Sequence, residues 1–209
     1  MLVLCSDGLT GAALLDAVRI AAGKGNRAAV VVTADPIYKE RNYHVARVRA
    51  ELESIGLGVD LFDLDTMPAK RLLSYDVVEC IGGNPFYLLH AIRAQRAAEV
   101  FQMLARTHVL IGWSAAVFVF GPTLALVNQY SPELNEWGIS DLRGLGLTKI
   151  EALPHYDRFL TRIDGFEQIC SDYERKHGVS VLRLNDGDGV WIDGETICVC
   201  RGSNEQRLY

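Results

Sequence analysis

The sequence predicts an α/β fold with a mainly parallel sheet and a closing β-hairpin at the C-terminus. Short apolar runs bounded by turn residues alternate with amphipathic segments, and this alternation implies right-handed crossover connections. The run Ala28–Thr33 is apolar almost throughout, which is typical of a strand buried on both faces. No linker, repeat or low-complexity segment interrupts the 209 residues, so we expect one domain over residues 1–209.

The first half of the chain has the most regular pattern. Each expected strand is a short apolar run, and each expected helix has apolar residues on one face. Gly56 ends the second helix, and Gly82-Gly83 follow the fourth strand. We expect strands at residues 2–5, 28–33, 59–64, 76–81 and 109–112, and helices at residues 10–23, 41–55 and 85–104.

The second half of the chain has weaker periodicity. Residues 122–145 carry two prolines and two glycines, and we expect them to form a long functional loop. The turn Asp186-Gly187-Asp188-Gly189 leads into the closing hairpin. We expect strands at residues 150–154, 180–184, 190–193 and 195–201, and a helix at residues 164–177.

Composition and charge argue against several classes of protein. The net charge is −5, whereas phosphate binding needs clustered Lys and Arg, so we expect no nucleic-acid partner. There is no run of about 18 apolar residues and no signal-type N-terminus, so we expect no membrane partner and a cytoplasmic location. The five cysteines form no CxxC pair, which favours reduced thiols over disulfides or a metal site.

A serine follows the fifth expected strand directly, in the segment Gly112-Trp113-Ser114-Ala115-Ala116. A serine in a tight strand-to-helix turn is exposed at the end of the sheet, and the next backbone N–H points toward the group that the hydroxyl attacks. A serine at this place also serves as an ordinary helix N-cap. The pentapeptide alone leaves both interpretations open.

Two glycines end the fourth expected strand, in Ile81-Gly82-Gly83-Asn84. Adjacent glycines leave backbone N–H groups unshielded, which suits an oxyanion hole. The same segment is also typical of an ordinary strand-to-helix turn, with Asn84 as the N-cap and Pro85 at the first helical position. One turn is able to serve both purposes.

His155 is the one histidine of five that we expect at a strand end, after Pro154. The other four fall within or beside expected helices. A neutral imidazole takes a proton from a serine and returns it to a leaving group. A structural role remains the alternative for His155 taken alone.

Read together, these motifs resemble the dipeptidase E and cyanophycinase family of serine peptidases. The resemblance extends over nearly the whole chain and implies a three-layer sandwich similar to class I glutamine amidotransferases, which is a flavodoxin-like arrangement. Its motifs are GGNPFYLL at residues 82–89, GWSA at 112–115, GP at 121–122, GLGL at 144–147 and PHY at 154–156.

By this resemblance Ser114 is the nucleophile and His155 the general base in the hydrolysis of a small peptide through an acyl-enzyme, without metal or cofactor. The backbone N–H groups of Gly83 and Ala115 would form the oxyanion hole. The chain departs from the family at Ala116, where the usual residue is glycine.

The acid that orients His155 is left open by the sequence. Where the family has an aspartate after the nucleophile, this chain has Asn128-Gln129. We favour Glu133, which follows Pro132 in the expected loop, with Asp141 or Gln129 as alternatives. A solvated surface position is the competing interpretation for the two acids.

Asn84 and Arg158 are the candidate substrate contacts, because an amide binds a peptide group and a guanidinium binds a carboxylate bidentately. An N-cap and an exposed arginine are the structural alternatives. The leading function is a serine peptidase acting on dipeptides or other short peptides. The alternatives are another amide or ester hydrolase using the same pair and a non-catalytic relative that binds a small ligand. A homodimer is compatible with the sequence.

Overall fold

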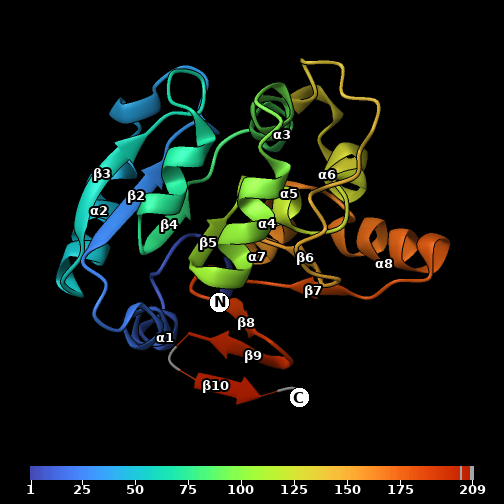
Figure 1. The fold of residues 1–209 in the computed structure, drawn as a ribbon. Coiled ribbons are helices and arrows are strands. Elements are labelled where there is room, and N and C mark those ends of the chain that lie inside the picture. The colour runs from blue at the N-terminus through green and yellow to red at the C-terminus, as the bar shows by residue number, and fades with distance from the viewer. Residues whose placement is uncertain (203, 208–209) are drawn as a thin grey trace.

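Eight strands form the main sheet in a computed structural model of the chain, which describes residues 1–202 and 204–207 (Figure 1). The strand order is β10-β9-β8-β1-β5-β4-β2-β3. The five strands from β1 to β3 in this order are parallel, and β8, β9 and β10 add an antiparallel edge. The mainly parallel sheet and the closing hairpin are therefore confirmed. The strands are β1 (Leu2–Cys5), β2 (Arg27–Val31), β3 (Gly58–Phe62), β4 (Val77–Cys80), β5 (Val109–Trp113), β8 (Gly189–Asp193), β9 (Thr196–Arg201) and β10 (Asn204–Arg207).

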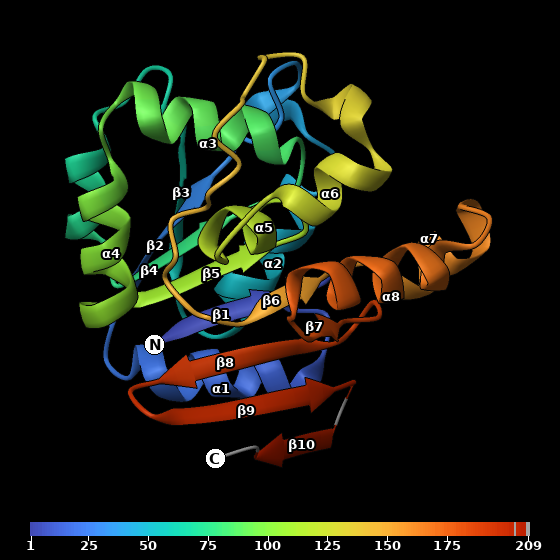
Figure 2. The same cartoon turned by 90° about the vertical axis from the view of Figure 1, so that its right-hand side faces the viewer.

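Helices cover both faces of this sheet (Figure 2). On one face α1 and α2 bury residues such as Leu14 and Val48 against the strands, and the remaining helices contribute to the core of the other face. Among the helices in the described ranges, none has the length and apolar character needed to cross a bilayer. The helices are α1 (Ala12–Ala22), α2 (Val45–Ser54), α3 (Pro85–Ala94), α4 (Ala98–Thr107), α5 (Ala115–Phe120), α6 (Ala125–Tyr130), α7 (Tyr156–Arg162) and α8 (Phe166–His177).

A separate two-stranded sheet pairs β6 (Glu151–Leu153) with β7 (Val181–Arg183) in parallel. Leu153 lies opposite Arg183, and the Leu184 N–H donates to the Leu153 carbonyl at 2.9 Å. The carboxyl ends of two parallel strands lie at the same edge of a sheet. The residues that follow β6 and β7 are therefore brought side by side, although they are far apart in the sequence.

The single helix expected over residues 85–104 is wrong, because the structure has two helices, α3 and α4, with a break between them. Arg96 in the break has a φ of 53°, which a continuous right-handed helix excludes. The Gln95 side chain accepts from the Ala69 N–H at 2.9 Å and donates to the carbonyl of Met67 at 3.0 Å. These side-chain bonds to a distant segment hold the chain at the break.

The long loop expected over residues 122–145 also contains helical structure that the sequence did not indicate. It holds α6 and a 3₁₀ turn, η3 (Pro132–Leu134), and a β-bridge joins Thr123 to Arg143 near its ends. Two further 3₁₀ turns, η1 (Lys39–Arg41) and η2 (Ala69–Ser74), lie in the first half of the chain. Residues 122–145 are consequently folded, and α6 and η3 lie beside the turn that follows β5.

Candidate active site

Ser114 occupies the sharp turn between β5 and α5. Its φ of 53° and ψ of −111° are unusual for a residue with a side chain, and such strain is typical of functional positions. Its N–H donates to the carbonyl of Ser6 at 3.1 Å, which fixes the turn against the end of β1. A Cβ at Gly82 would lie 2.9 Å from the Ser114 Cβ, so position 82 in the neighbouring turn has room only for glycine. The Ser114 side chain makes no N-cap hydrogen bond, which removes the main structural explanation for it.

His155 follows β6 and is held by an aspartate that follows β7. Its Nδ1 lies 2.7 Å from Oδ1 of Asp186, and the His155 side chain is only 15% exposed. His155 has a left-handed φ of 55°, so its backbone also departs from the ordinary regions. Burial alone would raise the pKa of Asp186, but the hydrogen bond and charge of His155, with Ser6 and Arg158, hold it below its usual value. Asp186 therefore presents an ionised carboxylate to the imidazole.

Ser6, which is fully buried, ties the pair to the end of β1. Its hydroxyl accepts from the His155 N–H at 2.8 Å and donates to Oδ1 of Asp186 at 3.0 Å. Next to it, Asp7 accepts from the Gly187 N–H at 2.9 Å. Because Ser6 also bonds the turn of Ser114, the end of β1 positions the serine, the histidine and the aspartate together.

The structure corrects the expected acid, since none of the three residues proposed from the sequence makes the bond to His155. Glu133 is exposed on η3. Asp141 pairs with Arg143 at 2.8 Å, and Gln129 lines a different cavity beside α8. The hydrogen bond to His155 is made instead by Asp186, which the sequence analysis placed only in a turn.

Ser114 and His155 line one cavity of about 120 Å³, together with Gly83 and Ala115. Only glycine fits at 83, because its φ is +152° and a Cβ would lie 2.3 Å from the carbonyl oxygen of Ala34. Within residues 1–202, the N–H groups of Gly83 and Ala115 donate to no other protein group. Two unpaired N–H groups beside a serine hydroxyl are the kind of donors that form an oxyanion hole.

The two proposed substrate contacts have structural partners instead. Oδ1 of Asn84 accepts from the N–H groups of Phe86 and Tyr87, so Asn84 is the N-cap of α3, and its Nδ2 donates to the Leu134 carbonyl. Arg158 forms an ion pair with Oδ2 of Asp186. Neither residue lines the cavity beside Ser114.

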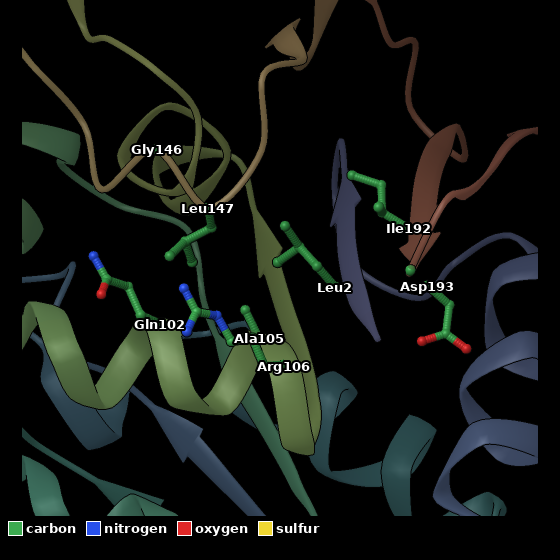
Figure 3. A pocket seen from close by; sticks show the side chains of 9 residues that line it. Leu2, Gln102, Ala105, Arg106, Gly146, Leu147, Ile192 and Asp193 are labelled. Carbon is green, nitrogen blue, oxygen red and sulfur yellow. The ribbon is translucent and has the colours of Figure 1, made fainter.

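A larger cavity of about 360 Å³ lies at the opposite ends of the strands. It is lined by Leu2 at the start of β1 and by polar residues such as Arg106 and Asp193 (Figure 3). It holds neither Ser114 nor His155, so the smaller cavity is the candidate active site. Nowhere in the described ranges do three or more His, Cys, Asp or Glu side chains gather as a potential metal site.

Comparison with known protein families gives a match over residues 4–200 to the model of Peptidase family S51. The chain belongs to peptidase family S51. It is therefore a member of a serine peptidase family, as its motifs suggested.

Individual relatives of this S51 chain are only 20–27% identical to it over the matched residues. It is similar to peptidase E of Escherichia coli O6:K15:H31, with 27% identity over 164 residues, which are 77% of this chain and 70% of the relative. It is also similar to peptidase E of Streptomyces coelicolor, with 27% identity over 81% of this chain and 70% of the relative. The crystal structure of a candidate peptidase E protein from Listeria monocytogenes EGD-e has the same fold, with a TM-score of 0.77 at 20% identity, covering 100% of this chain and 98% of the other.

The S51 chain accommodates Ala116 where its family usually has glycine. Ala116 is fully buried, and its methyl lies 3.0 Å from where a Cβ at Gly112 would be. The absence of a side chain at Gly112 thus makes room for the methyl within the core. Ala116 does not line the cavity beside Ser114, so its methyl group is not part of the cavity wall.

Proposed function

We propose that this protein is a serine peptidase that hydrolyses dipeptides or other short peptides through an acyl-enzyme on Ser114. The observation that carries the proposal is the hydrogen-bonded His155–Asp186 pair on a cavity that Ser114 also lines. A carboxylate at Nδ1 holds the ring in the tautomer whose Nε2 is free to accept a proton. His155 is accordingly the general base.

In the proposed first step, Oγ of Ser114 attacks the scissile carbonyl carbon while its proton passes to Nε2 of His155. The carbonyl oxygen gains the negative charge, which the N–H groups of Gly83 and Ala115 stabilise. His155 then gives the proton to the leaving amine as the C–N bond breaks, which leaves an ester on Ser114. A water molecule repeats the sequence on the ester and releases the acid.

The size of the cavity supports a short substrate. A volume of about 120 Å³ accepts one side chain. The relatives named peptidase E support a peptidase activity in general.

A panel of dipeptides tests the proposal directly. We expect turnover of unblocked dipeptides, and slower turnover as the peptide is lengthened. Equal or faster hydrolysis of blocked amides or simple esters would assign the same residues to a different hydrolase. Absence of hydrolysis of any member of the panel by the folded protein would reject the proposal.

A further inference from the structure

The walls of the cavity beside Ser114 are mainly apolar. Their polar groups are Ser131, His155 and Tyr130, whose buried hydroxyl has no hydrogen-bond partner among the described residues. Phe118 on α5 and Val127 on α6 are nearly buried, and Leu134 on η3 and Phe159 on α7 are half-buried. Among the residues that the structure describes, none of those that line the cavity is Lys, Arg, Asp or Glu. The cavity therefore offers a substrate side chain dispersion contacts and no fixed charge to pair with.

An anionic side chain would be poorly accommodated in such a pocket. A carboxylate that leaves water without gaining a cationic partner is disfavoured, and the hydroxyls of Tyr130 and Ser131 in the wall are neutral donors that offset only part of this cost. Arg158 is already paired with Asp186 and lies outside the lining of the cavity. The structure consequently provides no cation within the cavity wall for an acidic substrate residue.

The volume of the cavity limits the size of the side chain. An apolar protein cavity of about 150 Å³ holds a benzene molecule, and this one is smaller, at about 120 Å³. Its outer wall is held by an aromatic cluster, in which the Tyr130 and Phe159 rings lie 5.0 Å apart and the Phe159 and Phe166 rings 5.2 Å apart. A branched aliphatic side chain therefore fits this space more readily than an aromatic ring with its methylene group.

The position of the oxyanion donors indicates which residue of the substrate enters the cavity. Gly83 and Ala115 line it together with the nucleophile. The attacked carbonyl must lie against these N–H groups, so the side chain in the same cavity belongs to the residue that carries this carbonyl. In a dipeptide this is the N-terminal residue.

We propose that the cavity of Phe118, Val127, Tyr130, Leu134 and Phe159 selects short peptides whose scissile carbonyl belongs to an uncharged aliphatic residue such as Val or Leu. This inference rests on the proposed peptidase function. It assigns the apolar wall residues as the determinants of specificity.

The first test compares kcat/KM for Leu-Ala, Val-Ala, Phe-Ala, Lys-Ala and Asp-Ala. We expect Leu-Ala to exceed Asp-Ala on the order of 100-fold and also to exceed Phe-Ala. A kcat/KM for Asp-Ala or Lys-Ala equal to or above that of Leu-Ala would overturn the assignment. Hydrolysis of none of the dipeptides would instead reject the peptidase function itself, so the two failures are distinguishable.

The second test changes the charge of the cavity wall at the half-buried Leu134. Leu134→Arg should raise the ratio of kcat/KM for Asp-Ala to that for Leu-Ala by roughly tenfold or more, because it supplies the missing cation. Leu134→Gln is the matched control, being polar and uncharged, and should leave this ratio nearly unchanged. The same change of ratio in both variants, or in neither, would contradict the proposal.

The third test enlarges the cavity and does not depend on Leu134. Phe118→Leu removes ring volume from the wall, and it should raise kcat/KM for Phe-Ala relative to Leu-Ala about tenfold. Thermal melting of each variant checks that it is folded. A folded Phe118→Leu variant with the wild-type preference would show that this wall does not set specificity.

Discussion

At the scale of single residues, catalysis depends on which group orients His155. Asp186 lies 2.7 Å from the Nδ1 atom and also accepts from the buried Ser6 hydroxyl. A carboxylate in this position fixes the tautomer and stabilises the imidazolium that forms during the reaction, which a neutral amide does not. The charge of the aspartate is therefore expected to affect the chemical step.

Asp186→Asn should lower kcat/KM by roughly 10⁴-fold, because it keeps the shape of the side chain and removes the charge. Glu133→Gln is the matched control, since Glu133 is exposed on η3, and it should retain the wild-type value. Steady-state kinetics on the best dipeptide give both numbers. A large loss in the Glu133 variant with little loss in the Asp186 variant would reverse the assignment.

At the scale of elements, each functional residue lies within three residues of the end of a strand. Ser6, Gly83 and Ser114 follow strands of the main sheet, while His155 and Asp186 follow the two strands of the small sheet. Parallel strands bring their carboxyl ends to one edge, which explains how residues from five segments meet. The turn after β4 is the most constrained of these segments, because the carbonyl of Ala34 leaves no room for a side chain at Gly83.

Gly83→Ala should destabilise the protein by about 2 kcal/mol or more, and it should also lower activity, because the turn must move to relieve the collision. Gly178→Ala is the control. Gly178 also has a positive φ, of +65°, but a methyl group added there would meet open space. We expect a cost of about 1 kcal/mol there and unchanged kcat/KM. Urea denaturation measures both costs. Equal stability losses in the two variants would contradict this account of the turn.

The strands and the strand-end serine, glycines and histidine were predictable from the sequence because the apolar runs are continuous and end at turn residues. The break at Arg96 was not, since Gln95 and Arg96 both suit a helix and only bonds to a distant segment separate α3 from α4. The six residues of α6 are too few to show helical periodicity. Asp186 could have been identified, because it closely follows a strand expected at residues 180–184, as His155 follows its own strand.

At the scale of the whole molecule, a buried acid lies beneath the active site. Glu79 on β4 is fully buried and accepts from the indole N–H of Trp113, the residue before Ser114, at 3.0 Å. Burial, together with the charge of Glu51, raises the pKa of Glu79 to about 8. The native state thus keeps a proton that the unfolded chain releases near its ordinary value of 4.5.

Stability should therefore fall as pH rises from about 4.5 to about 8, because the unfolded state has already lost the proton in this range. Glu79→Gln keeps an acceptor for Trp113 and removes the titration, so its Tm advantage over wild type should grow between pH 5 and pH 8 and stay constant above it. Glu53→Gln, on the exposed surface of α2, should follow the wild-type curve. Parallel pH curves for wild type and Glu79→Gln would show that the buried acid does not titrate in this range.

The most direct measurement of the central claim is covalent labelling with a fluorophosphonate, followed by mass mapping of the modified peptide. We predict a single adduct on Ser114, which is lost in Ser114→Ala and strongly slowed in His155→Ala. Ser114→Ala should melt close to wild type, because the half-exposed hydroxyl contributes little to packing. A folded wild-type protein that stays unlabelled, or that is labelled at another residue, would contradict the assignment of Ser114 as a nucleophile activated by His155.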